Sequence, residues 1–513
     1  MTTPEVLRAG SAPYSESSRS ADVVDERGAE GSLVVPTLSG FAAVVVLSIG
    51  ATLAGSPYVL HLPGAWLFGT GKHTVEARTV GIIGVFAGMA VLIVAWCQLV
   101  GYLRRHPVTP VRTVAVIFAL WALPAIIAPP MFSRDVYSYA ADGQMVTSGI
   151  NPYVNGPDSL AFVAPQYASL VDPIWRQTPT PYGPLSLGVD AGIVDVTGHH
   201  EVAAIEGLRL LALAGVILAA ALLPGLARQW GTAPSLVVAL AVLNPLTLLG
   251  LISPGHNDAL MIGLMIAALA LSRRGRPFLA VAVCALAASV KSPALLATAF
   301  IAWEWASREL TWRGRGRMLT AMAVVTFGVL EAVTLLTGLG WGWVHTAGIA
   351  GMVQSVTTPT TDLALLAEKV VHVVRFGPSV ATLIKLTRGL GYMVIAATCG
   401  WLLWRRERVG ALLALALSLL LLVAMGPVYQ PWYLAWGLFC LAPVAVGRWQ
   451  LLFMGVSIYG TISVLPRFEP LVASTGLVGD TFGLVVAVAL VALCSTRVEA
   501  RIRRIDWLPL KTP

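Results

Sequence analysis

Hydrophobic residues occupy this chain in a series of continuous runs, most of them about 20 residues long, separated by polar segments. A helix of that length crosses the roughly 30 Å hydrocarbon core of a bilayer. Because the runs are continuous and do not alternate with polar residues, they are typical of helices and exclude an outer-membrane β-barrel. The pattern therefore predicts an all-α polytopic membrane protein.

About 14 transmembrane segments are expected, with boundary errors of a few residues. They are residues 34–55, 79–102, 113–131, 203–226, 233–252, 258–272, 277–290, 292–307, 317–340, 381–404, 409–426, 432–447, 450–466 and 478–496. The short segments 277–290 and 292–307 meet beside Pro293, so they form either a hairpin of half-length helices or one kinked helix. Arginine clusters on both sides of this stretch favour an even number of crossings.

Arginines concentrate in one set of loops, whereas the opposite set is longer and much less basic. The clustered arginines are Arg104, Arg105, Arg112, Arg273, Arg274, Arg276, Arg313, Arg315, Arg317, Arg405, Arg406, Arg408, Arg497, Arg501, Arg503 and Arg504. Because basic loops stay on the cytoplasmic side, both termini are expected there, and the long loops 132–202 and 341–380 face outward. The first of these loops contains an expected interfacial amphipathic helix over Pro184–Val196.

Composition agrees with this architecture. Hydrophobic residues make up 57% of the chain and charged residues 12%, about half of the usual charged share, and the mean hydropathy is +0.77. These values exclude a soluble enzyme, a disordered protein and a nucleic-acid binder, and the net charge of +8 follows from the basic loops. The cysteines lie inside apolar runs without a CxxC pair, so neither a disulfide framework nor a zinc site is expected. They are Cys97, Cys284, Cys399, Cys440 and Cys494.

Three regions are expected along the chain. Residues 1–33 are polar and lack the apolar core of a signal peptide, so they are expected to be a disordered cytoplasmic tail followed by an uncleaved anchor. Residues 34–496 form the transmembrane domain, and residues 497–513 a basic cytoplasmic tail. No internal repeat is evident, which weakens the interpretation as an inverted-repeat transporter.

The motif Phe132-Ser133-Arg134-Asp135-Val136-Tyr137-Ser138-Tyr139 begins the first outward loop. Charges at a membrane surface are costly and tend to be paired or functional. Asp135 is a candidate general base; the alternative is that it caps the following helix while Arg134 anchors the chain at the interface. Asp142, two helical turns later, would share the face of Asp135.

The same loop holds two rigid turns, Asn151-Pro152-Tyr153 and Thr180-Pro181-Tyr182-Gly183-Pro184-Leu185. A tyrosine on such a turn binds a sugar or phosphate, or simply packs at the membrane interface.

Ser253-Pro254-Gly255-His256-Asn257-Asp258 forms a short outward turn. Asn257 or Asp258 would cap the following helix, and we expect Asp258 to be the cap and His256 to be the functional candidate.

Lys291, in Val290-Lys291-Ser292-Pro293, has no Asp or Glu within a helical turn. It is either a snorkelling lysine or a point charge for a phosphate group, and the proline break favours a site.

The last cluster is Gly426-Pro427-Val428-Tyr429-Gln430-Pro431-Trp432-Tyr433, an outward turn rich in aromatic side chains. An aromatic belt explains Trp432 and Tyr433 but not Gln430, and packing of the aromatic faces against pyranose rings is the competing explanation. Glu331 is a further carboxylate inside an expected segment. All five clusters fall on the outward side, which suggests chemistry on a lipid-linked polar substrate. No Walker loop, GxGxxG, HExxH or calcium loop stands in a suitable context.

These motifs together resemble those of the actinobacterial polyprenyl-phosphomannose-dependent α-1,6-mannosyltransferases, which are GT-C fold enzymes. The resemblance covers nearly all of residues 34–496. It implies transfer of mannose from polyprenyl-phosphate-mannose onto the α-1,6-linked backbone of lipomannan and lipoarabinomannan, outside the cytoplasmic membrane, by an inverting single displacement. It also implies a polyprenyl-phosphate lipid and a mannan or phosphatidylinositol-mannoside-type glycolipid as partners, with no nucleic acid, no cofactor and no metal site.

The resemblance further implies a role for each candidate residue. Asp135 matches the general base of the family, and the growing charge on the leaving phosphate would be stabilised by Lys291, Arg134 and His256. The expected sugar- and acceptor-binding residues are Tyr137, Tyr139, Asp142, Tyr182, Asn257, Asp258, Tyr429, Gln430, Trp432 and Tyr433. The alternatives are a transporter or flippase, or a polymerase, of lipid-linked sugars. A transporter should carry charges through the full membrane thickness, whereas here Glu331 is the clear intramembrane charge.

Overall fold

The computed structural model describes residues 32–55, 75–349, 358–374 and 378–465, and these residues contain helices and turns but no strand. The helices are α1 Val34–Ala54, α2 Val75–Arg105, α3 Val111–Ile127, α4 Asp135–Thr147, α5 Pro165–Leu170, α6 Pro184–Val196, α7 Glu201–Gln229, α8 Pro234–Ala241, α9 Pro245–Thr247, α10 Asp258–Arg273, α11 Pro277–Val290, α12 Ala294–Ala306, α13 Trp312–Thr337, α14 Gly342–Thr346, α15 Pro359–Val374, α16 Val380–Val409, α17 Ala411–Met425, α18 Leu434–Leu441 and α19 Arg448–Ser463. Short 3-10 turns cover Pro157–Leu160, Pro431–Tyr433 and Ala442–Val444, and a π-helical turn covers Leu248–Ile252.

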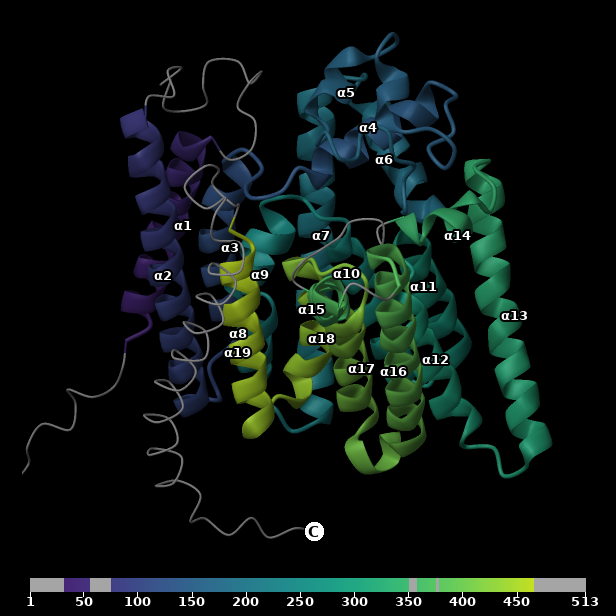
Figure 1. Cartoon of the computed structure of the whole chain (residues 1–513). Coiled ribbons are helices and arrows are strands. Elements are labelled where there is room, and N and C mark those ends of the chain that lie inside the picture. The colour runs from purple at the N-terminus through teal and green to yellow at the C-terminus, as the bar shows by residue number, and fades with distance from the viewer. Residues whose placement is uncertain (1–31, 56–74, 350–357, 375–377, 466–513) are drawn as a thin grey trace, which may run out of the picture.

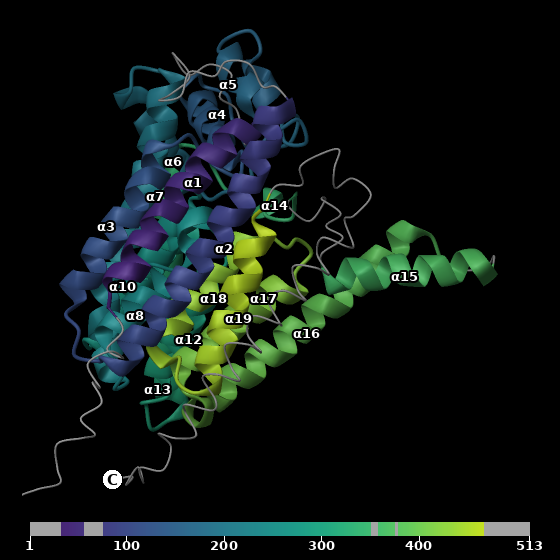
Figure 2. The same cartoon turned by 90° about the vertical axis from the view of Figure 1, so that its left-hand side faces the viewer.

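The long helices form a bundle, and α4, α5 and α6 gather at one end of it as a compact group (Figure 1), here named the α4–α6 subdomain. Helices α1, α2 and α3 pack together along one side of the bundle, while α13 lies at the opposite edge. Figure 2 shows that α15 and α16 extend away from the other helices.

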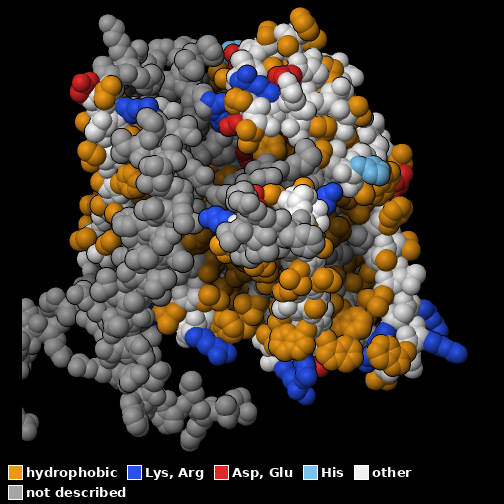
Figure 3. Space-filling model, viewed as in Figure 1, with side chains coloured by type: hydrophobic (Ala, Val, Ile, Leu, Met, Phe, Trp, Pro, Cys, Tyr) orange, Lys and Arg blue, Asp and Glu red, His pale blue; other side chains and the backbone are white. Residues whose placement is uncertain are grey.

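Basic side chains mark the end of the bundle opposite to the α4–α6 subdomain, along the lower edge of Figure 3. The chain turns at that end between α10 and α11, between α12 and α13, and between α16 and α17. Those are the loops in which the sequence concentrates arginine, so the structure separates the basic loops from the long loop 132–202. The expected orientation, with the basic loops in the cytoplasm and the loop 132–202 outside, requires this separation.

Each expected segment from 34–55 to 450–466 overlaps one helix or a run of short helices, while 478–496 lies outside the described residues. Within the described residues, five helices are long and apolar enough to cross a membrane: α1, α2, α7, α13 and α16. A sixth is obtained if Pro234–Ala241 and Pro245–Ile252, bent by 47°, count as one broken span. An all-helical, multi-pass membrane architecture is therefore supported, while the number of 14 segments and the GT-C fold stay predictions.

The stretch 277–307 is a hairpin. The Cys284 thiol of α11 donates a hydrogen bond to the carbonyl of Ala294 in α12 (3.3 Å), which a continuous helix could not allow because these residues are ten positions apart. At the arginine-rich end, Trp305 Nε1 donates to Ser272 Oγ (2.9 Å). The chain therefore reverses at Lys291–Pro293 and holds Lys291 at the opposite end.

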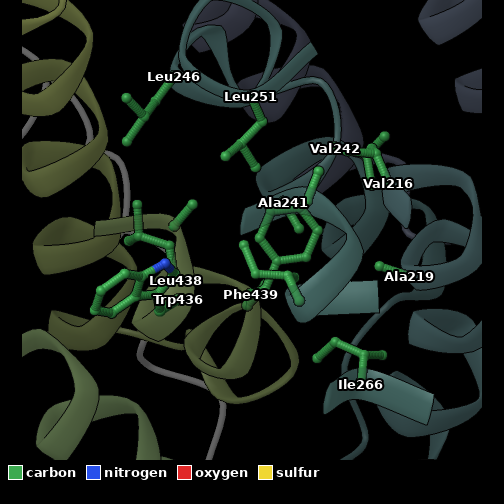
Figure 4. Close-up of a cluster of buried hydrophobic side chains, with 14 of the residues drawn as sticks. Val216, Ala219, Ala241, Val242, Leu246, Leu251, Ile266, Trp436, Leu438 and Phe439 are labelled. Carbon is green, nitrogen blue, oxygen red and sulfur yellow. The ribbon is translucent and has the colours of Figure 1, made fainter. Parts of the chain in front are cut away.

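The core beneath the site joins α7, α8, α10 and α18. Figure 4 shows buried side chains from these helices meeting around Phe439, among them Val216, Ala241 and Ile266. Helices α7 and α10 can approach closely because Gly215 has no side chain. A Cβ atom at this position would overlap the Ala259 carbonyl. The close packing fixes the first turns of α10 and α18, from which several site residues project.

Candidate active site

Asp135 is the first residue of α4, the helix with which the α4–α6 subdomain begins. Its backbone N–H donates to Ser133 Oγ (3.1 Å), and the N-cap residue Arg134 makes no side-chain capping bond. The carboxylate of Asp135 lies close to His256, with 3.5 Å between Asp135 Oδ2 and His256 Nε2. The Asp135 side chain is 22% exposed, so part of it is open to solvent while the rest faces the protein.

The ring of His256 is fully buried and has a defined orientation. Its Nδ1 donates to the Gly250 carbonyl, and its Nε2 lies 3.0 Å from Ser133 Oγ. The ring stacks on Trp432 with 3.9 Å between the centroids. Motifs far apart in the sequence, 132–139, 253–258 and 426–433, therefore meet around one imidazole.

The pKa of Asp135 reflects these neighbours. Burial alone would raise it, because a carboxylate loses solvation inside the protein. The hydrogen bond and charge of His256, together with the charge of Lys291, reverse that effect and hold the pKa below its ordinary value. Asp135 is therefore ionised at neutral pH and able to accept a proton.

Arg209, in the expected segment 203–226, anchors the turn that carries His256. It is fully buried; its Nε donates to the Ser253 carbonyl (2.9 Å), and its Nη2 donates to the Ala125 carbonyl (2.7 Å). Its Nη1 bonds both carboxylate oxygens of Glu206, each at 2.8 Å. Sequence reasoning missed both residues, although two opposite charges three positions apart within an apolar run were a usable signal.

Lys291 lies in a buried ion pair with Asp258. Its Nζ is 3.0 Å and 2.9 Å from the two carboxylate oxygens of Asp258, and Trp436 Nε1 donates to the same carboxylate at 2.6 Å. Asp258 is fully buried, so its charge must be compensated by these partners. The expectation that Asp258 only caps its helix is therefore wrong, because its carboxylate points across to the hairpin turn.

Aromatic rings surround the lysine. Lys291 Nζ lies 4.4 Å from the Tyr433 ring centroid, 5.4 Å from that of Tyr182 and 5.7 Å from that of Trp436. Tyr433 and Trp436 stack on each other, and Tyr139 meets Tyr182 edge to face, with centroids 5.0 Å apart. These rings line one side of the site with flat apolar faces and hydroxyl groups, a combination that suits a sugar ring. Trp436 was not singled out in the sequence, because it lies within an apolar segment.

Backbone contacts hold the first loop against the hairpin. The Gly183 N–H of the loop donates to the Val290 carbonyl of the hairpin (3.1 Å). Within the loop, the Tyr153 hydroxyl donates to the Tyr182 carbonyl (3.1 Å). A Cβ atom at Gly183 would overlap the carbonyl of Ser289, so this position has space for glycine only. The close approach places Tyr182 beside Lys291.

Other candidate residues lie around this centre. Asn257 Nδ2 donates to Ser186 Oγ (3.2 Å), and Ser186 Oγ donates to Asp190 Oδ2 (3.4 Å), which ties the 253–258 turn to α6. Asp142 is buried beside Asp190 in the α4–α6 subdomain, where loss of solvation raises its pKa to about 7. Burial also lowers the pKa of Arg134, which is near Asp172.

Four further residues singled out in the sequence have the following surroundings. The ring of Tyr137 is buried in the α4–α6 subdomain, and the Tyr429 ring lies 6.0 Å from that of Tyr459. Gln430 precedes the 3-10 turn that presents Trp432 and Tyr433. Glu331 accepts a hydrogen bond from Trp341 Nε1 at 2.8 Å. Within the part of the chain that the structure describes, no group of three or more His, Cys, Asp or Glu side chains is arranged to hold a metal ion.

Comparison with known proteins gives a consistent result over both halves of the chain. The family description "Alpha-(1->6)-mannopyranosyltransferase, N-terminal domain" matches residues 37–307, and "MptB C-terminal domain" matches residues 360–496. The chain is 33% identical to the alpha-(1->6)-mannopyranosyltransferase A of Mycobacterium tuberculosis, over 80% of this chain and 81% of the relative. It is 31% identical to a probable alpha-(1->6)-mannopyranosyltransferase of Mycolicibacterium smegmatis, over 93% and 90% of the two chains.

A third relative, the alpha-(1->6)-mannopyranosyltransferase B of Corynebacterium glutamicum, is 28% identical over 84% of this chain and 76% of its own length. No solved structure matches the chain.

Proposed function

Because this chain belongs to the alpha-(1->6)-mannopyranosyltransferase family and is thus a glycosyltransferase, we propose that its donor is polyprenyl-phosphate-mannose. The acceptor is the non-reducing end of an α-1,6-linked mannan on a glycolipid, of the lipomannan and lipoarabinomannan type. The reaction takes place on the outer side of the cytoplasmic membrane. The position of the site, at the end of the bundle away from the arginine loops, supports that side.

The reaction is a single displacement with inversion at the anomeric carbon. Asp135 takes the proton from the 6-hydroxyl of the acceptor mannose, and the oxygen forms a bond to C1 of the donor mannose. The bond between C1 and the phosphate oxygen breaks, and the polyprenyl phosphate leaves with the electron pair. A partly exposed, ionised carboxylate beside an otherwise buried polar cluster supports this role for Asp135.

The leaving phosphate needs a positive partner as its charge grows. Lys291 carries three N–H donors, and the two oxygens of Asp258 engage only part of that capacity. The Tyr433 hydroxyl also interacts with the ammonium, and we infer that a phosphate oxygen takes the place of this phenol, with Arg134 as a second contributor of charge. Asp258 then holds the ammonium in place so that it does not have to reorient during the reaction.

The sugar ring is proposed to lie against the aromatic side of the site, on Tyr433, Trp436 and Tyr182. Flat ring faces bind the apolar face of a pyranose, and the phenol groups hydrogen-bond its hydroxyls. The acceptor enters from the first outward loop, next to the exposed edge of Asp135.

The observation that carries the proposal is the juxtaposition of Asp135 and Lys291, from motifs 156 residues apart (291 minus 135), in a chain of this family. The test measures transfer from radiolabelled polyprenyl-phosphomannose to an α-1,6-mannan acceptor in membranes containing the protein. Asp135→Asn keeps the size of the side chain but loses its basicity, so turnover should fall by at least about 100-fold.

Asp158→Asn, which changes an exposed carboxylate in the same loop, is the matched control and should transfer normally. Near-normal transfer by a well-expressed Asp135→Asn protein would show that Asp135 is not the general base. Failure of the wild-type protein to elongate any α-1,6-mannan from this donor would reject the proposed reaction itself.

A further inference from the structure

His256 has a contact pattern that sets its tautomer. The Gly250 carbonyl only accepts hydrogen bonds, so Nδ1 must carry a proton. In the neutral ring Nε2 then has a free lone pair, and it is directed at Ser133 Oγ (3.0 Å) and Asp135 Oδ2 (3.5 Å). The Ser133 hydroxyl can donate to this lone pair while its oxygen accepts the backbone N–H of Asp135.

We propose that Asp135 and His256 form a proton-sharing pair in which His256 positions the catalytic carboxylate and takes over the proton that the carboxylate removes from the acceptor. The inference rests on the proposed mannosyl transfer. It differs from a direct contact of His256 with the donor phosphate, because the imidazole is fully buried behind Asp135, Ser133 and Trp432.

The proton balance closes within this group. The acceptor O–H bond breaks as the new oxygen–carbon bond forms, and the proton reaches Asp135. It then moves to Nε2 of His256, either directly or through the Ser133 hydroxyl, and leaves an imidazolium facing a regenerated carboxylate. After the product departs, the proton returns through Asp135, whose edge is exposed, to water.

The surroundings allow the imidazole to gain this charge. Asp135 is the carboxylate facing Nε2, while Asp258 is already bound to Lys291. Arg209 reaches the same turn but directs its guanidinium to carbonyls and Glu206. The phenols of Tyr139 and Tyr182 also lie within electrostatic reach of Asp135, and burial raises their pKa values, so they stay neutral at physiological pH.

The test compares kcat and the donor KM of His256→Asn with those of the wild-type protein, with His200→Asn, which changes an exposed histidine of the first outward loop, as the control. Asparagine can still donate to the Gly250 carbonyl but offers nothing at Nε2. We expect kcat to fall by about 10- to 100-fold, with little change in the donor KM. Loss of a direct contact with the donor phosphate would instead raise the donor KM.

Ser133→Ala keeps the imidazole and its stacking partner and removes only the hydroxyl between the two groups. It should lower kcat by a smaller factor than His256→Asn and leave the donor KM unchanged, so the proposal stays testable if His256→Asn fails to fold. An unchanged kcat in both variants, or a raised donor KM with unchanged kcat, would overturn the proposed pair. If that result is obtained while wild-type protein transfers mannose and Asp135→Asn does not, the pair is rejected and the proposed function stands.

Discussion

Replacing Lys291 with alanine leaves Asp258 as a fully buried carboxylate without the ammonium that compensates its charge, although Trp436 still donates to it. Breaking a buried ion pair by removing one partner costs about 3–5 kcal/mol, because the remaining charge loses its compensation. The contact of the ammonium with the Tyr433 ring, about 0.5–2 kcal/mol in such settings, is lost as well. We therefore expect Lys291→Ala to be strongly destabilised, in addition to any catalytic defect.

The double variant Lys291→Met/Asp258→Asn separates the two effects. The new amide at position 258 can still accept the Trp436 N–H, and methionine fills the volume of the lysine stem, so most of the stability should return. If Lys291 also binds the donor phosphate, the same stable variant should transfer mannose slowly and bind the donor weakly. Lys291→Arg, which keeps the charge, should retain part of both properties.

Thermal unfolding of the purified protein in detergent measures the stability of each variant, and the transfer assay measures its activity and donor affinity. Lys385→Ala, which removes an exposed lysine of α16, is the control for loss of a positive charge. Wild-type thermal stability of Lys291→Ala would refute the ion-pair reasoning. Wild-type donor affinity in the stable double variant would refute the phosphate contact.

Three other perturbations test different parts of the molecule. Asp142 has its pKa raised to about 7 by burial, so the folded protein keeps a proton that the unfolded chain releases near the ordinary pKa of 3.8. Thermal stability should therefore fall as pH rises between these values and then level off, and Asp142→Asn should flatten that slope; an unchanged slope would contradict the burial argument. Gly183→Ala should push the first loop off the Ser289 carbonyl and reduce transfer at least about tenfold without unfolding the bundle, whereas full activity would show that the contact is dispensable. Single cysteines at positions 166 and 315 of a cysteine-free protein should label from opposite sides of the membrane, and labelling of both from outside would overturn the orientation.

The positions of the helices could be predicted from the sequence because each depends on a local property. An apolar run of sufficient length must form a helix in a membrane, where unpaired backbone groups are too costly. The hairpin at Lys291–Pro293 needed one further fact, the contact between Cys284 and Ala294, because a proline break alone is compatible with a kink. The bent pair Pro234–Ala241 and Pro245–Ile252 was likewise predicted as one span, since the angle at Asn244 depends on packing with distant residues.

Which charged side chains pair with one another could not be predicted from the sequence. Lys291 seemed isolated because its partner Asp258 is 33 positions away on another helix. Glu331 was expected to be the clear intramembrane charge, yet the helix α7 also holds Arg209 and Glu206 beside a long run of leucines and alanines. Ion pairs inside a membrane protein are set by which helices become neighbours, and that is a property of the whole bundle.

The two carboxylates of the site differ in a way that assigns their tasks. Asp258 is fully buried and bonded to Lys291 and Trp436, so a substrate hydroxyl could reach it only by displacing a neutralising partner. Asp135 has a histidine on one side and an exposed edge on the other. Proton abstraction requires both an approach path for the acceptor and a low cost of changing charge, and of these two carboxylates Asp135 combines them. Both carboxylates belong to the first residue of a helix. Asp258 holds a cation and Asp135 receives a proton, because each carboxylate meets a different partner across the bundle.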